Sequence, residues 1–150
     1  MANTDIISVE ELAACSSRFH QIYALSQKLN DNFAEKIQKI CEQNKTISAK
    51  NFSEKTGYPL KRFYRLIHEE SFNIQTLVSF FIVFEIDLQT AFNLLKSLGI
   101  TFSPTNKVHY AYCYLISEYS GETLYKCNEI LKYLGFKNSE FLGSKDSWPI

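Results

Sequence analysis

The chain has 150 residues, which suits one domain with an extension, and apolar residues make up 45% of it, enough for a hydrophobic core. Its five glycines and three prolines are too few for a turn-rich β-sandwich or barrel, so the composition favours helices. The 16 basic and 16 acidic side chains cancel, so the net charge by itself indicates no nucleic-acid partner.

The basic residues are nevertheless unevenly distributed along the chain. Residues 43–65 contain six basic side chains and one acidic side chain, Glu54, and carry a local charge of +5. The rest of the chain, with 10 basic and 15 acidic side chains, carries −5. Because a phosphate backbone responds to the local field, this segment is a candidate nucleic-acid contact. Its basic residues are Lys45, Lys50, Lys55, Lys61, Arg62 and Arg65.

Two helices are predicted in the first third of the chain. Ser8 followed by Glu11 has the pattern of a capping box, and the helix after it extends to about residue 28. A polar turn is expected at residues 30–32. A second helix follows over residues 32–42, because apolar residues recur there on one helical face. That face carries Phe33, Ile37, Ile40 and Cys41.

Two short helices around a glycine are predicted between residues 48 and 67. Ser48 is a good N-cap for a helix over residues 49–56. Gly57 ends that helix, because the tight turn needs a positive φ angle. Pro59 suits the first turn of the next helix, where no amide hydrogen is needed. This spacing is typical of a helix-turn-helix.

Helices are also expected in the second half of the chain. Residues 74–86 have strand propensity but are predicted as a buried helix, because no second strand-like run is present to pair with them. Asp87 caps a further helix, and two helical stripes follow over residues 108–119 and 124–134. Residues 137–150 are predicted to be a loosely packed tail. The total is seven or eight helices and no strand.

No catalytic, metal or cofactor site is expected. The four cysteines are far apart and form no CxxC pair, so we interpret them as buried, reduced thiols of a cytosolic protein. The chain has no Gly-rich phosphate loop, HExxH motif or nucleophile elbow, which argues against an enzyme. It also shows no secretory signal, and its longest apolar stretch, residues 77–84, is too short to span a bilayer. A cytoplasmic protein is therefore expected.

The segment around the predicted helix-turn-helix resembles the Xre/Cro/cI family of phage and bacterial regulators. The likeness covers residues 32–99. Residues 32–42 are similar to that family's first helix, Ile74-Gln75-Thr76-Leu77 to the start of its fourth, and Ala91-Phe92-Asn93-Leu94-Leu95 to its fifth. The resemblance implies an all-α, lambda-repressor-like bundle.

This resemblance also implies a division of the chain. The helix-turn-helix domain is expected at residues 32–100, with an N-terminal helical extension at residues 1–31. A C-terminal helical extension at residues 101–150 is expected to pack on the domain.

Sequence-specific binding of double-stranded DNA, as a repressor-like transcriptional regulator, is the function that the resemblance implies. Residues 59–68 would be the recognition helix in the major groove, with Lys61 and Arg62 at base edges because both types can bond guanine. Ser48 and Lys50 would meet phosphate at a helix N-terminus. A homodimer is expected from half-site geometry. The predicted DNA-binding residues are Ser48, Lys50, Leu60, Lys61, Arg62, Tyr64 and Arg65.

The alternative is a protein-interaction module that has kept this fold and lost DNA recognition. Ala49 stands where the family often has glutamine, and Pro59 stands where it usually has a serine or threonine cap. Glu69 and Glu70 follow the predicted recognition helix, where negative charge disfavours phosphate. The C-terminal helices are then candidate contacts for a protein partner. The tyrosines of this region are expected to pack in the hydrophobic core, and a role in a dimer contact is the second interpretation. They are Tyr110, Tyr112, Tyr114 and Tyr119.

Overall fold

The computed structural model describes residues 6–29, 33–68, 73–103 and 105–149. These ranges contain eight α-helices and no strand, which confirms the all-α prediction. The chain divides into two compact units, residues 1–32 and 33–150. The predicted turn at residues 30–32 lies outside the described residues.

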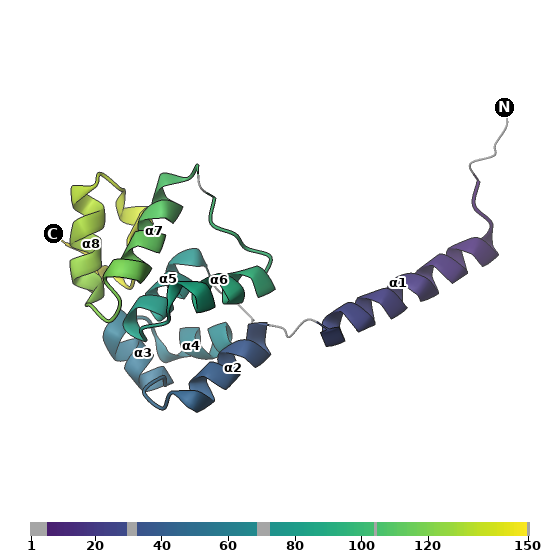
Figure 1. Ribbon diagram of the computed structural model, residues 1–150, viewed down its shortest axis with the longest axis horizontal. Coiled ribbons are helices and arrows are strands. Elements are labelled where there is room, and N and C mark those ends of the chain that lie inside the picture. Colours follow the sequence, from purple (N-terminus) through teal and green to yellow (C-terminus); the bar gives the residue numbers. More distant parts are fainter. Residues whose placement is uncertain (1–5, 30–32, 69–72, 104, 150) are drawn as a thin grey trace. The chain divides into compact units, whose positions relative to one another are not determined.

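The first unit is a single helix, α1 (Val9–Leu29), which is drawn as one continuous ribbon in Figure 1. The hydroxyl of Ser8 accepts a hydrogen bond from the backbone amide of Glu11 at 3.1 Å, as the predicted N-cap requires.

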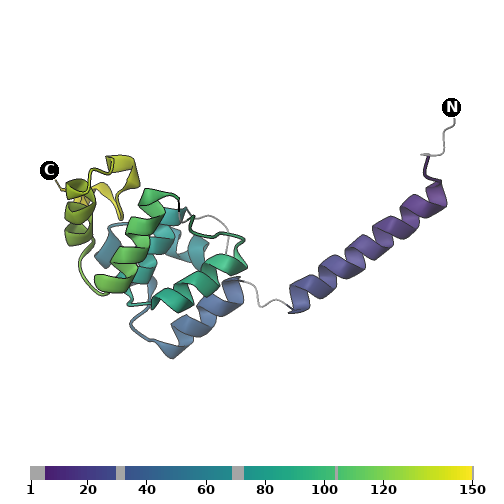
Figure 2. The same cartoon turned by 45° about the horizontal axis from the view of Figure 1, so that its top comes forward.

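The second unit contains the other seven helices, and Figure 2 shows them packed into one bundle. Its central helix is α5, in which every residue from Thr76 to Val83 is buried. A helix that is apolar all round has to be enclosed by other elements, and the structure therefore confirms the prediction of a buried helix over this run. The helices of this unit are α2 (Phe33–Gln43), α3 (Ala49–Thr56), α4 (Leu60–Ile67), α5 (Ile74–Val83), α6 (Leu88–Ser97), α7 (Lys107–Glu118) and α8 (Leu124–Tyr133).

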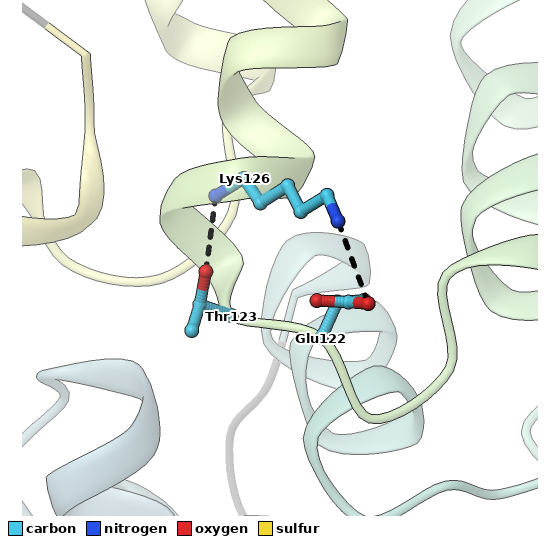
Figure 3. Close-up of polar contacts among 3 residues, drawn as sticks. All are labelled: Glu122, Thr123 and Lys126. Carbon is cyan, nitrogen blue, oxygen red and sulfur yellow. Dashed lines mark hydrogen bonds and ion pairs between the residues drawn. The ribbon is translucent and has the colours of Figure 1, made fainter.

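Side-chain caps set the N-termini of most of these helices. Asn73, Asp87, Asn106 and Thr123 accept hydrogen bonds from the first-turn amides of α5, α6, α7 and α8. At α8, the hydroxyl of Thr123 accepts from the amide of Lys126 at 3.2 Å, and the ammonium of Lys126 lies 3.5 Å from the carboxylate of Glu122 (Figure 3). Because both charged side chains are about half exposed, the cap fixes this turn more than the ion pair does.

The C-terminal segment corrects the prediction of a loosely packed tail. Phe141 and Leu142 are buried, and the segment continues through the short 3₁₀ turns η1 (Asn138–Glu140) and η2 (Lys145–Ser147). The buried side chain of Asn128 on α8 donates to the carbonyls of Leu142 and Ser147, at 2.8 and 2.9 Å, and accepts from the amide of Leu142 at 2.7 Å. The side chain of Asn128 thus satisfies backbone groups of this segment and holds it in place. Such a contact leaves no periodic pattern in the sequence, which is why the sequence alone predicted a loose tail.

This segment, residues 137–149, is named the C-terminal strap because it also binds α5 and α3. The amide of Gly143 donates to the hydroxyl of Ser79 on α5 at 3.1 Å. The amide of Ser144 donates to the carbonyl of Thr56, the last residue of α3, at 2.8 Å. The strap therefore closes over the corner between α3 and α4.

Gly57, which follows Thr56, has a φ of 78°, and a Cβ at this position would overlap the side chain of Ser144. Gly99, with a φ of 74°, is a matched control because no atom beyond Gly99 and its two chain neighbours lies within 4 Å of the Cβ position there. We expect Gly99→Ala to lower the free energy of unfolding by about 1 kcal/mol, the cost of the left-handed backbone alone. We expect Gly57→Ala to lower the free energy of unfolding by about 1–3 kcal/mol more than Gly99→Ala does, because the added methyl group also clashes with the side chain of Ser144.

Urea unfolding of the two variants measures this difference, and Ser144→Gly in the Gly57→Ala background should recover part of it. Equal stability of the two alanine variants would show that the strap does not press on this corner.

Candidate nucleic-acid interface

The corner between α3 and α4 is fixed by local hydrogen bonds. Ser48 caps α3, with its hydroxyl accepting from the amide of Asn51 at 3.1 Å. The amide of Gly57 donates to the carbonyl of Ser53 at 2.8 Å, and the hydroxyl of Ser53 donates to the carbonyl of Tyr58 at 2.7 Å. These bonds fix the end of α3 and the turn before α4. They confirm the predicted N-cap at Ser48 and the predicted turn at Gly57.

Aromatic packing holds this pair of helices on α5. Phe52 on α3 is fully buried, and its ring centroid lies 5.6 Å from that of Phe63 on α4 and 6.2 Å from that of Phe80 on α5. Tyr58 and Leu66 are also buried. These buried residues fix one side of α4 on the core and leave the other side free to face outward.

The outward side of α4 carries two cations and two apolar groups. Leu60 and Tyr64 are about half exposed, and Lys61 and Arg65 are exposed. Because Tyr64 lies four residues after Leu60 and three after Lys61, and Arg65 lies four after Lys61, the four side chains share one broad helical surface. Within the described ranges, neither Lys61 nor Arg65 has a carboxylate partner. We name this surface the α4 face: Leu60, Lys61, Tyr64 and Arg65.

Arg62 differs from its neighbours because its guanidinium is held against the protein. The guanidinium carbon lies 4.3 Å from the ring centroid of Tyr58, and Nη1 donates to the hydroxyl of Thr76 on α5 at 3.4 Å. The side chain is half-buried. The predicted contact of Arg62 with a base remains a prediction, whereas this structure gives the residue a bracing contact between α4 and α5.

The remaining basic residues of the positive segment do not all lie on the α4 face. Lys50 is exposed in the first turn of α3, two residues after the half-buried Ser48. Lys55 lines a small hollow of about 200 Å³, with Glu122 and Gly121 in its wall. The charge of the segment is therefore split between two sides of α3. Glu69 and Glu70 lie outside the described residues.

The tyrosines of α7 correct a second sequence interpretation. Tyr112 is buried, and its hydroxyl donates to the carbonyl of Glu140 at 2.6 Å. Burial raises the pKa of this phenol. Tyr110 and Tyr114, which we expected in the core, are instead exposed and line a groove of about 600 Å³ between α7 and α8, together with Leu134. Sequence reasoning missed this groove because helical spacing does not tell a core stripe from a surface one.

The cysteines correct the expectation of four buried thiols. All four are free, but only Cys127 is buried, and desolvation raises its pKa to about 12. Cys41 and Cys113 are half-buried, and Cys15 on α1 is exposed. In the part of the chain that the structure describes, no three histidine, cysteine or acidic side chains gather as metal ligands. Over the same residues, no helix combines the length and apolar character needed to cross a membrane.

Comparisons with known proteins returned no significant match for the chain, whether to a protein-family model, a curated protein or a solved structure.

The position of Arg62 predicts different effects for neighbouring arginines of α4. Arg62→Met keeps the alkyl stem but loses the contacts with Tyr58 and Thr76, and we expect it to lower the free energy of unfolding by about 1–2 kcal/mol. Arg65→Met, at an exposed position, is the matched control and should change stability by less than about 0.5 kcal/mol. Urea denaturation of both variants checks this, and equal stabilities would contradict a bracing role for Arg62.

Proposed function

We propose that the protein binds double-stranded DNA sequence-specifically, as a transcriptional regulator of the Xre/Cro/cI type. In this proposal α3 and α4 are the helix-turn-helix, and α4 enters the major groove. The observation that carries the proposal is the α4 face: a short helix, anchored by buried aromatic rings, that presents outward two cations with no carboxylate partner among the described residues. Such a surface combines attraction to phosphate with groups able to bond base edges.

The geometry suggests a role for each group. Lys61, in the first turn of α4, is the best placed to bond a guanine edge, and Leu60 is beside it to contact a thymine methyl. Tyr64 and Arg65 follow one turn later and suit phosphate. Ser48 and Lys50 lie at the N-terminus of α3, where the helix dipole favours an anion. Arg62 positions α4 by bracing it on α5.

Regulation would follow from occupying an operator, with no chemical step and no cofactor. Half-site recognition by this class of motif uses two copies, so the proposal includes a homodimer.

A protein-interaction module is the second candidate, and the groove between α7 and α8 favours it. Exposed aromatic and aliphatic groups such as Tyr110 and Leu134 around a hollow of about 600 Å³ suit a protein partner. The two candidates differ in their response to salt. A regulator that neutralises several phosphates loses affinity for duplex DNA steeply as salt rises, whereas an interaction module shows no such binding.

A selection from fragmented genomic DNA with the purified full-length chain tests the proposal directly. Enrichment of a common site, followed by fluorescence anisotropy on that duplex, would support it. Absence of binding to any duplex at ~50 mM salt, where phosphate contacts are strongest, would reject it in favour of the interaction module.

Lys61 should be the side chain whose loss matters most for specificity. We expect Lys61→Ala to weaken binding to the selected duplex by about tenfold or more, because a base contact of this kind contributes roughly 1–3 kcal/mol. Lys107→Ala removes another exposed lysine, in the first turn of α7, and should change affinity little. Anisotropy titrations with the selected duplex and with a scrambled duplex measure both effects, and equal losses for the two variants would remove α4 from the interface.

A further inference from the structure

Helix α1 has an apolar stripe that no other described part of its own unit covers. At 3.6 residues per turn, its members lie within about 60° of Phe19 around the helix axis. Leu12, Phe19, Ile22 and Tyr23 are 54–68% exposed, and Cys15 is exposed as well. The rings of Phe19 and Tyr23 stack on each other, with centroids 6.3 Å apart. We name this surface the α1 stripe: Leu12, Cys15, Phe19, Ile22 and Tyr23.

The spacing of the α1 stripe fits a helix that packs lengthwise on another helix. Leu12, Cys15, Phe19 and Ile22 are separated by three, four and three residues, the alternation of three and four that a coiled-coil seam shows. The opposite face carries the polar residues Glu10, Ser17 and Gln21 together with the small residues Ala14 and Ala24. Because helices in proteins gain most of their stability from packing an apolar face rather than from intrinsic propensity, a partner that covers the stripe would stabilise α1.

We propose that the α1 stripe is a dimerisation surface and that its occupant is the α1 stripe of a second copy of the chain. A self-complementary contact needs a patch without charge repulsion, and the stripe itself carries no ionisable group other than the weakly acidic Cys15 and Tyr23. The whole helix balances two acidic residues, Glu10 and Glu11, against two basic ones, Arg18 and Lys28, so two copies do not repel.

The size of the stripe also suits this occupant. If five side chains each bury on the order of 100 Å², the contact covers roughly 500 Å² per copy and about 1,000 Å² in total, the area at which a specific interface becomes credible. This proposal does not rest on DNA binding, although it supplies the contact that the proposed homodimer needs.

The test compares one variant on the stripe with one on the opposite face. Sedimentation of the full-length wild type at ~50 µM, a concentration that populates a dimer with a Kd in the micromolar range, should give a dimer of twice the 17.4 kDa chain. Phe19→Glu places a charge in the stripe and should weaken dimerisation by at least about 100-fold. Gln21→Glu adds the same charge to the opposite face and should leave the dimer within about threefold of wild type.

Folding is checked separately, because Trp148 is the single tryptophan and lies in the second unit. Its emission should report the same thermal unfolding in all three proteins. A monomeric wild type would overturn the proposal, including the case in which α1 is covered by its own chain or by a different protein. Dimerisation of Phe19→Glu with wild-type affinity would overturn it too. No DNA is present in these measurements, so failure of the DNA-binding proposal leaves their outcome unchanged.

Discussion

The complete burial of α5 is the constraint on which the second unit depends. A helix without a polar face has to be enclosed on all sides, and here α3, α7 and α8 pack against it while α4 reaches it through aromatic contact. Phe80 contacts both Phe52 and Phe63, so the orientation of the α3–α4 pair is set by the same ring that fills the centre. The α4 face points outward because the opposite side of α4 is fixed on this axis.

The C-terminal strap makes the α3–α4 corner part of a larger cooperative structure. Ser79 on α5 accepts from Gly143, and Thr56 on α3 accepts from Ser144, so backbone atoms of the strap complete hydrogen bonds at both elements. Buried backbone groups left without such partners would be costly. Residues 33–150 form one compact unit. Loosening the strap would therefore destabilise the turn that orients α4.

Much of the helical architecture could be predicted from the sequence because its signals are local. Ser48, Gly57 and Asp87 act through neighbouring backbone atoms, and their caps and turns were predictable from residue type alone. The ordered conformation of the strap was not predictable in this way, because it depends on a hydrogen bond between the side-chain amide of Asn128 and the backbone of Leu142, fourteen residues away. The role of Arg62 depends likewise on Thr76 and on the ring of Tyr58, which no periodicity reveals. The exposure of Tyr110 could not be predicted either, because helical spacing assigns residues to one face of a helix but does not show whether other elements cover that face.

The distribution of charge connects the proposed DNA contact with the proposed dimer. With a net charge of zero, long-range attraction contributes little, so the proposed affinity for DNA would have to come from cations placed at the interface itself. Each copy offers few of them, because Lys55 faces the hollow beside Glu122 and Arg62 is braced on the protein. The phosphate contribution to binding scales with the number of cations engaged, so joining two copies would double it without any new surface. A chain with so few exposed cations would therefore need self-association to reach the phosphate contribution that one copy of a strongly basic chain supplies alone.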